Sequence, residues 1–282
     1  MTEKSTRFLD RGRHLWLGLA LIAVMWPLNW FLPGLRTMFL FFPLWLGYIL
    51  TVDGLVLRRR GSSLLSRAGP SEAVMLFLIS AVSWWLFEAV NLVLHNWRYL
   101  GRELIGDAAY ALFASVAFSV VMPAVFASAE LVRDSAWIER FGSGPRLRPT
   151  RRNLLLLIAI GFVMLALSLG FPDLFFPLIW GAIYLILDPL NHLLGKASLL
   201  DRLERGDWRP VASLAAGALM TGFFWELWNY FSYPKWVYDI PGVGFLHIFE
   251  MPLLGYLGYL PFGLELFALF ALLRWRPLDP QL

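Results

Sequence analysis

Two glutamates, Glu88 and Glu226, lie inside apolar stretches of this 282-residue chain and share the same neighbours. An aromatic residue precedes each glutamate, an asparagine follows three residues later, and a Trp-x-Tyr triplet comes soon afterwards. Ionisable side chains are costly inside a membrane and often mark a functional site there. A buried glutamate that keeps its proton can serve as a general acid, so we take both glutamates as candidate catalytic residues. The two copies comprise Phe87, Glu88, Asn91, Trp97 and Tyr99, and Trp225, Glu226, Asn229, Trp236 and Tyr238.

Polar and aromatic residues near the glutamates complete the candidate site. A helix places Glu88, Asn91 and His95 on one face, and we expect His247 and Glu250 to begin the last helix at a similar depth. Structural roles stay open: asparagines join helices, Trp and Tyr form belts at membrane surfaces, and a rim histidine can simply be hydrogen-bonded. We expect no metal and no cofactor. The candidate substrate-binding residues are Asn91, Asn229, Trp97, Tyr99, Trp236, Tyr238, His95, His247 and Glu250.

The glutamates are carried by a chain that is 59% hydrophobic, against about 45–50% for a soluble domain. Its apolar residues gather in eight segments, most of them near the roughly 20 residues that cross a bilayer. We therefore predict an all-α, polytopic membrane bundle of about eight transmembrane helices. Pro123, Pro252 and Pro261 lie in the two longest segments, where we expect tilt or kinks. The segments are 15–32, 37–57, 72–95, 104–132, 153–170, 174–194, 210–232 and 245–273.

The positive charges predict an orientation for this bundle. Of the 24 Lys and Arg residues, 20 lie at the termini and in alternate loops, which places both termini in the cytoplasm of a multi-pass cell-membrane protein. The net charge of +4 then reflects topology and does not indicate nucleic-acid binding. The chain has no cysteine, which excludes disulfides, thiolate metal sites and a cysteine nucleophile.

The duplication extends beyond the glutamate motif. Phe-Phe-Pro-Leu occurs at 41–44 and again at 175–178, and Asp53 and Asp188 follow near the ends of the two segments. We expect these aspartates to form structural pairs with arginine. The pattern predicts two parallel four-helix repeats, 1–140 and 153–282, joined by a cytoplasmic linker at 141–152, with a shared site between the halves.

The motif resembles that of the membrane-integral lycopene cyclase domain of bacteria, archaea and fungi, itself a duplicated helical unit. That family has an aromatic-acid pair, then Trp-x-Tyr, a glycine-containing stretch and a Pro-x-Glu-Glu motif. The paired glutamates are absent here, because Leu253 and Leu254 follow Pro252, although Glu250 and Glu265 flank the position. The matching residues are Trp225-Glu226, Trp236-Val237-Tyr238, Gly242, Gly244 and Pro252, and in the first half Phe87-Glu88, Trp97-Arg98-Tyr99 and Gly101.

The resemblance implies a cyclase or isomerase of the type used in carotenoid biosynthesis, acting by acid catalysis on an isoprenoid or another lipid-soluble substrate. Cyclisation of such a molecule needs an acid, exclusion of water and aromatic faces that stabilise a carbocation. The alternatives are a proton-coupled transporter and a non-catalytic lipid-binding membrane protein. The expected partner is thus a membrane lipid or isoprenoid small molecule, and the sequence makes no prediction of oligomeric state.

Overall fold

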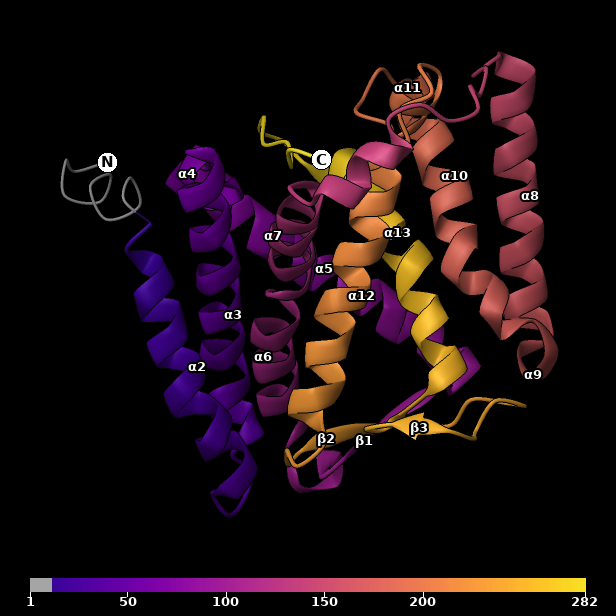
Figure 1. Cartoon of the computed structure of the whole chain (residues 1–282). Coiled ribbons are helices and arrows are strands. Elements are labelled where there is room, and N and C mark those ends of the chain that lie inside the picture. Colours follow the sequence, from indigo (N-terminus) through magenta and orange to yellow (C-terminus); the bar gives the residue numbers. More distant parts are fainter. Residues whose placement is uncertain (1–11) are drawn as a thin grey trace.

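The computed structural model describes residues 12–282, and eight of its helical segments are long and apolar enough to cross a membrane (Figure 1). This confirms the prediction of a helical multi-pass membrane protein. The N-terminal basic residues Lys4, Arg7 and Arg11 lie outside the described residues. The spans are α2 (His14–Phe31), α3 (Thr37–Arg60), α5 (Pro70–Leu94), α6 with α7 (Asp107–Phe118, Val121–Arg133), α8 (Arg151–Gly170), α9 to α10 (Pro172–Phe175, Ile179–Leu193), α12 (Arg209–Asn229), and the 3-10 helix η4 with α13 (Leu253–Gly258, Tyr259–Leu273).

The fourth span is broken between α6 and α7, as its proline predicted, but the break lies upstream of Pro123. A proline has no N–H to donate and its ring clashes with the carbonyl four residues earlier, which here belongs to Ser119. The chain therefore turns at Ser119 and Val120, and α7 starts afresh at Val121. Pro123 then sits in the first turn of α7, where a missing N–H has no consequence.

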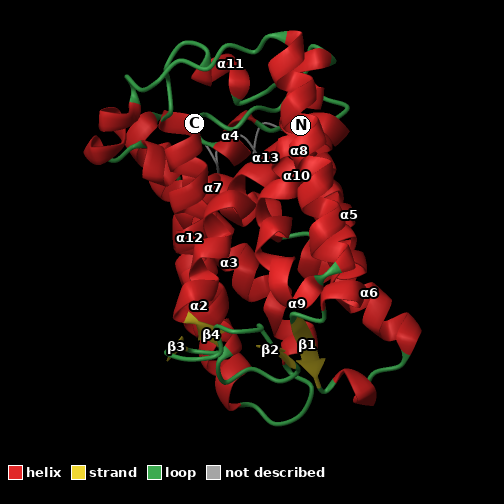
Figure 2. Ribbon diagram, turned by 90° about the vertical axis from the view of Figure 1, so that its right-hand side faces the viewer, coloured by secondary structure: helices red, strands yellow, loops and turns green. Residues whose placement is uncertain are grey.

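One end of the bundle carries four short strands, and we call it the ribbon end. Strands β1 (Trp97–Leu100) and β2 (Lys235–Tyr238) form one antiparallel ribbon, and β3 (His247–Ile248) and β4 (Met251–Pro252) form a small hairpin. Figure 2 shows these strands gathered opposite the end that holds the C-terminus and the short helices α4 (Leu64–Arg67) and α11 (Leu200–Leu203).

The last span begins later than its apolar sequence predicted. We expected a helix from residue 245, opened by His247 and Glu250, but His247 lies in β3 and Glu250 lies in the hairpin turn. The backbone is left-handed at Leu246 and Phe249, and Pro252 has no N–H for a helix, so the chain stays non-helical until η4.

Helices pack closely within each half and between the halves. Helix α2 packs on α3 in the first half and α8 packs on α10 in the second, while α7 crosses α12 between the halves. Gly217 permits the α7–α12 crossing, because a Cβ atom there would lie 2.5 Å from the backbone nitrogen of Ala129. Small residues let membrane helices approach in this way. The core is therefore continuous across the halves.

The two duplicated aspartates hold short helices, and none of the arginines within residues 12–282 forms an ion pair with them, so the predicted pairing is not found in this part of the chain. Asp53 accepts hydrogen bonds from the hydroxyl of Ser63 at 2.7 Å and the backbone N–H of Leu65 at 2.9 Å, and its carboxylate also lies 3.0 Å from the ring of His14. Asp188 accepts from Ser198 at 2.9 Å and from the backbone N–H groups of Leu199 and Leu200. Local backbone donors thus satisfy both carboxylates, which leaves no need for an arginine.

Candidate functional site

Each asparagine of the duplicated motif fixes the strand that follows its helix. The Asn91 side chain donates to the carbonyl of Trp97 at 2.8 Å and accepts from the Trp97 N–H at 3.3 Å. Asn229 makes the same two bonds to Trp236, at 2.7 and 3.0 Å. Each pair of hydrogen bonds closes the loop between the end of a helix and the strand that follows it. The asparagines therefore position the two tryptophans at the ribbon end.

Glu88 accepts hydrogen bonds from three aromatic side chains of its own half. The indole N–H groups of Trp84 and Trp97 donate to Oε1 at 2.9 and 3.1 Å, and the Tyr99 hydroxyl donates at 2.5 Å. Burial raises the pKa of Tyr99, so its phenol remains a neutral donor. This carboxylate is half-buried and fixes the orientation of three rings.

Glu226 is fully buried and accepts from two tyrosines that come from different elements. The Tyr238 hydroxyl of β2 donates to Oε1 at 2.6 Å, and the Tyr259 hydroxyl at the start of α13 donates at 2.7 Å. The indole N–H of Trp236 donates in turn to the Tyr238 oxygen at 2.9 Å. The second carboxyl oxygen, Oε2, has no hydrogen-bond partner among the described residues. Both phenols therefore bond to the same carboxyl oxygen, and the other oxygen is buried without a partner.

The β1–β2 ribbon joins the two copies of the motif directly. Trp97 pairs with Tyr238 across the ribbon, and Tyr99 pairs with Trp236. Each tryptophan lies opposite the tyrosine of the other copy, which is the pattern that a two-fold axis through the ribbon produces. The sequence placed these residues at a membrane rim but did not predict that they form a sheet.

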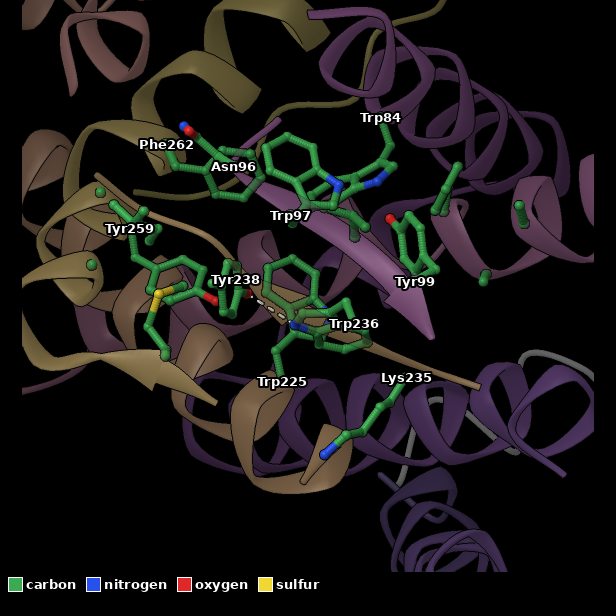
Figure 3. A pocket seen from close by; sticks show the side chains of 18 of the residues that line it. Trp84, Asn96, Trp97, Tyr99, Trp225, Lys235, Trp236, Tyr238, Tyr259 and Phe262 are labelled. Atoms are coloured by element: carbon green, nitrogen blue, oxygen red, sulfur yellow. Dashed lines mark hydrogen bonds between the residues drawn. The ribbon is translucent and has the colours of Figure 1, made fainter. Parts of the chain in front are cut away.

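A pocket of about 500 Å³ lies against this ribbon and is lined by both halves. The donors to the two glutamates face it, together with Trp225, whose ring centre lies 5.8 Å from that of Trp84 (Figure 3). Neither glutamate is itself part of the lining. The acids therefore lie behind a layer of aromatic side chains that a bound molecule would touch first. The aromatic lining includes Trp84, Trp97, Tyr99, Tyr110, Trp180, Trp225, Trp236, Tyr238, Tyr259 and Phe262.

The remaining predicted site residues are not part of the pocket lining. His95 is exposed at the end of α5, with its ring 3.1 Å from the carbonyl of Val93, and His247 is exposed in β3. Glu250 forms an ion pair with Lys235, which does line the pocket. No group of three potential metal ligands occurs among the residues that the structure describes.

Sequence reasoning missed the donors that lie outside the motif. Trp84 is one turn before Glu88, a spacing that could have identified it. Tyr259 lies 33 residues from Glu226, and no local pattern connects them. Glu265, which flanks the missing Pro-x-Glu-Glu position, is fully buried on α13 and is absent from the pocket lining.

No family model, curated protein or solved structure matches this chain. The likeness to lycopene cyclases therefore stands on the short sequence motifs alone. The fold and the pocket define a multi-pass helical membrane protein with an aromatic cavity at one end, held between two glutamate-centred clusters.

Proposed function

We propose that this protein is an integral membrane enzyme, of the cyclase or isomerase type, that acts on an isoprenoid-like lipid by acid catalysis. The observation that carries the proposal is the buried Glu226 carboxyl, bonded to two phenols that line an apolar pocket. Such a pocket accepts a lipid-soluble molecule, and two of its phenols converge on the Glu226 carboxyl.

The chemistry proceeds through the tyrosines, because Glu226 lies behind them. With Glu226 protonated on Oε1, the oxygen that faces both phenols, this proton moves to the oxygen of Tyr238 or Tyr259 while that phenol gives its own proton to a carbon of a substrate double bond. The π-electron pair forms the new C–H bond and leaves a carbocation, which the neighbouring rings stabilise. Loss of a proton from an adjacent carbon to the phenol, and from the phenol to the carboxylate, restores the enzyme. These steps convert the substrate into an isomer, so no other reactant is needed.

Glu88 has a different part in this proposal. Its carboxylate receives Trp84, Trp97 and Tyr99, three donors that fix one wall of the pocket. A fixed wall orients the substrate and excludes water. Glu88 is therefore a positioning residue, whereas the phenols bonded to Glu226 touch the substrate.

We further propose the parallel arrangement of two four-helix repeats, with the ribbon end facing outward and both termini in the cytoplasm of a cell-membrane protein. Three duplicated features support the repeats: the aspartate-held short helices, the asparagine-closed loops and the two-fold pairing of β1 with β2. The asymmetric distribution of Lys and Arg supports the orientation.

Mass spectrometry of lipid extracts tests the enzyme proposal. Cells that express the natural chain should contain a lipid-soluble isomer that is missing from cells without it and from cells with Glu226→Gln. Tyr259→Phe should lower its amount, and Glu204→Gln, which alters an exposed acid of an inter-helix loop, should leave it unchanged. Identical lipid profiles with and without the natural chain would contradict catalysis. A lipid that the protein binds but leaves unchanged would identify the non-catalytic alternative.

A further inference from the structure

The segment 240–258, between β2 and α13, is apolar although it is mostly non-helical. Its 19 residues include only two that can carry a charge, His247 and Glu250. The corresponding segment after the first motif, 101–106, contains Arg102 and Glu103 within six residues. Connections that face water are rarely so apolar, and exposed apolar patches mark an interaction surface.

The segment presents apolar side chains on two sides. Ile240, Val243 and Met251 line the pocket. Leu246 and Ile248 do not line it, yet 70% and 42% of their surfaces are exposed. Phe245 and Leu253 are likewise exposed and outside the lining. The wall of the pocket is therefore one layer of chain thick here, and its outer side is apolar.

The backbone holds this outer side in a defined position. Leu246 and Phe249 have φ angles of 53° and 58°, in the left-handed region that turns in water usually fill with glycine or asparagine. The N–H of Leu253 donates to the carbonyl of Leu246 at 2.9 Å, and the Tyr256 hydroxyl donates to the carbonyl of Ile248 at 3.1 Å. Bonds within the segment thus fix Leu246 and Ile248 in exposed positions, whereas Phe249 packs against Phe223 and Tyr230.

We infer that the segment 240–258 lies at the membrane interface of the ribbon end with its exposed apolar side chains in the lipid leaflet, and that an apolar ligand enters the pocket from the bilayer through this wall. Lipid acyl chains cover this surface, because the last six residues of the segment, 253–258, already belong to the candidate membrane span Leu253–Leu273. Apolar surface also continues on the neighbouring elements: Phe171 and Leu174, at α9, are exposed, and Trp180 of α10 lies beside Gly258. Figure 1 shows the β3 hairpin reaching out below α13 on the side of α9. The entry route rests on the proposed function, whereas the lipid contact does not.

The natural chain has no cysteine, so single cysteines can be introduced without other changes. Leu246→Cys and Ile248→Cys carry nitroxide labels in nanodiscs of phosphatidylcholine and phosphatidylglycerol. Glu103→Cys is the matched control, because Glu103 is an exposed residue at the same end. Labels at 246 and 248 should relax several-fold more with dissolved oxygen than with an aqueous nickel chelate, and the label at 103 should show the reverse.

Two results would overturn the lipid contact. Nickel access at 246 and 248 equal to that at 103 would place the segment in water. Dipolar broadening between labels on different molecules would mean that a second copy of the chain covers the surface.

The entry route is tested with diphenylhexatriene, an apolar rod-shaped polyene, added through the bilayer and followed by energy transfer from tryptophan in single nanodiscs. The Phe245→Asp and Leu253→Asp variants should each fill the pocket several-fold more slowly than the natural chain, with the same final occupancy. An unchanged rate in both would contradict entry through this wall. The two proposals can fail separately. If the labels at 246 and 248 lie in lipid but the chain changes no cellular lipid, the proposed function is refuted and the lipid contact stands. If these labels lie in water but a Glu226-dependent product forms, this inference is refuted and the proposed function stands.

Discussion

The two copies of the glutamate motif share a backbone plan and differ in how their acids are bonded. Glu88 is half-buried and takes its three donors from its own half. Glu226 is fully buried, takes one phenol from β2 and one from α13, and leaves one oxygen without a partner. Both acids accept these bonds on Oε1, but only Glu226 has its second oxygen among the buried atoms without a partner, and such an atom calls for a functional explanation. The two copies of the motif therefore have similar backbones, and the copy that contains Glu226 carries the chemistry that we propose.

The largest expected difference between the copies is in the rate of the proposed reaction. General acids contribute about 100-fold to 10,000-fold, so Glu226→Gln should lower conversion of the lipid substrate by about 100-fold or more. Glu88→Gln removes a carboxylate that positions the wall, and it should cost less than about tenfold by the same scale. Purified variants in nanodiscs, assayed by mass spectrometry, provide the measurement. Equal losses in the two variants would show that the copies are chemically equivalent.

The asparagines should affect stability, and again unequally. Replacing the buried Asn229 with alanine removes two hydrogen bonds to the backbone of Trp236, and a buried polar group left unpaired costs about 1–3 kcal/mol. Asn91→Ala should cost less, because Asn91 is only half-buried and water can replace part of its bonds. Thermal unfolding in nanodiscs measures the stability of both variants. Asn153→Ala, at an exposed position, is the control. A larger loss for Asn91→Ala would reverse this ranking.

The sequence predicted the framework well and the site only in part. Long apolar segments fixed seven of the spans to within a few residues, because the bilayer requires a helix of about 20 residues. The eighth starts at residue 253 and not at 245, because apolar character alone does not separate a helix from a lipid-facing hairpin. Glu226 was found because its motif is local, whereas its partner Tyr259 comes from a distant helix that only the tertiary fold brings near.

Alkaline pH should reveal a property that the two copies share. Burial raises the pKa of both Tyr99 and Tyr238, so these phenols ionise in the unfolded chain before they ionise in the folded protein. Their contribution to stability is complete below about pH 10 and is lost as the pH rises toward the higher folded values. Unfolding midpoints followed between neutral and strongly alkaline pH should fall, and either Tyr→Phe variant should flatten the fall. If only one of the two variants reduced the loss of stability at alkaline pH, the two copies of the motif would also differ at the tyrosines of the ribbon.

The smallest difference is expected at the charged rim of the pocket. Lys235 pairs with Glu250 in the second copy, and Arg102 pairs with Asp107 in the first. Partly exposed ion pairs contribute about 0–1 kcal/mol and are screened by salt. Lys235→Gln should lower the unfolding free energy slightly more than Arg102→Gln, because Asp107 is almost fully exposed. High salt should remove the difference, and a difference that persists would indicate a packing effect of the side-chain stems.

The central claim, that the pocket between the halves holds a lipid-soluble molecule, is tested most directly by mass spectrometry of the compounds that co-purify with the protein. Ala117→Trp places an indole in the pocket, and Ala111→Trp alters an exposed position of the same helix α6. We predict that the natural chain and Ala111→Trp retain the same apolar compound, enriched over bulk lipid, and that Ala117→Trp loses it. Equal retention by all three proteins, or no enriched compound in any of them, would contradict the claim.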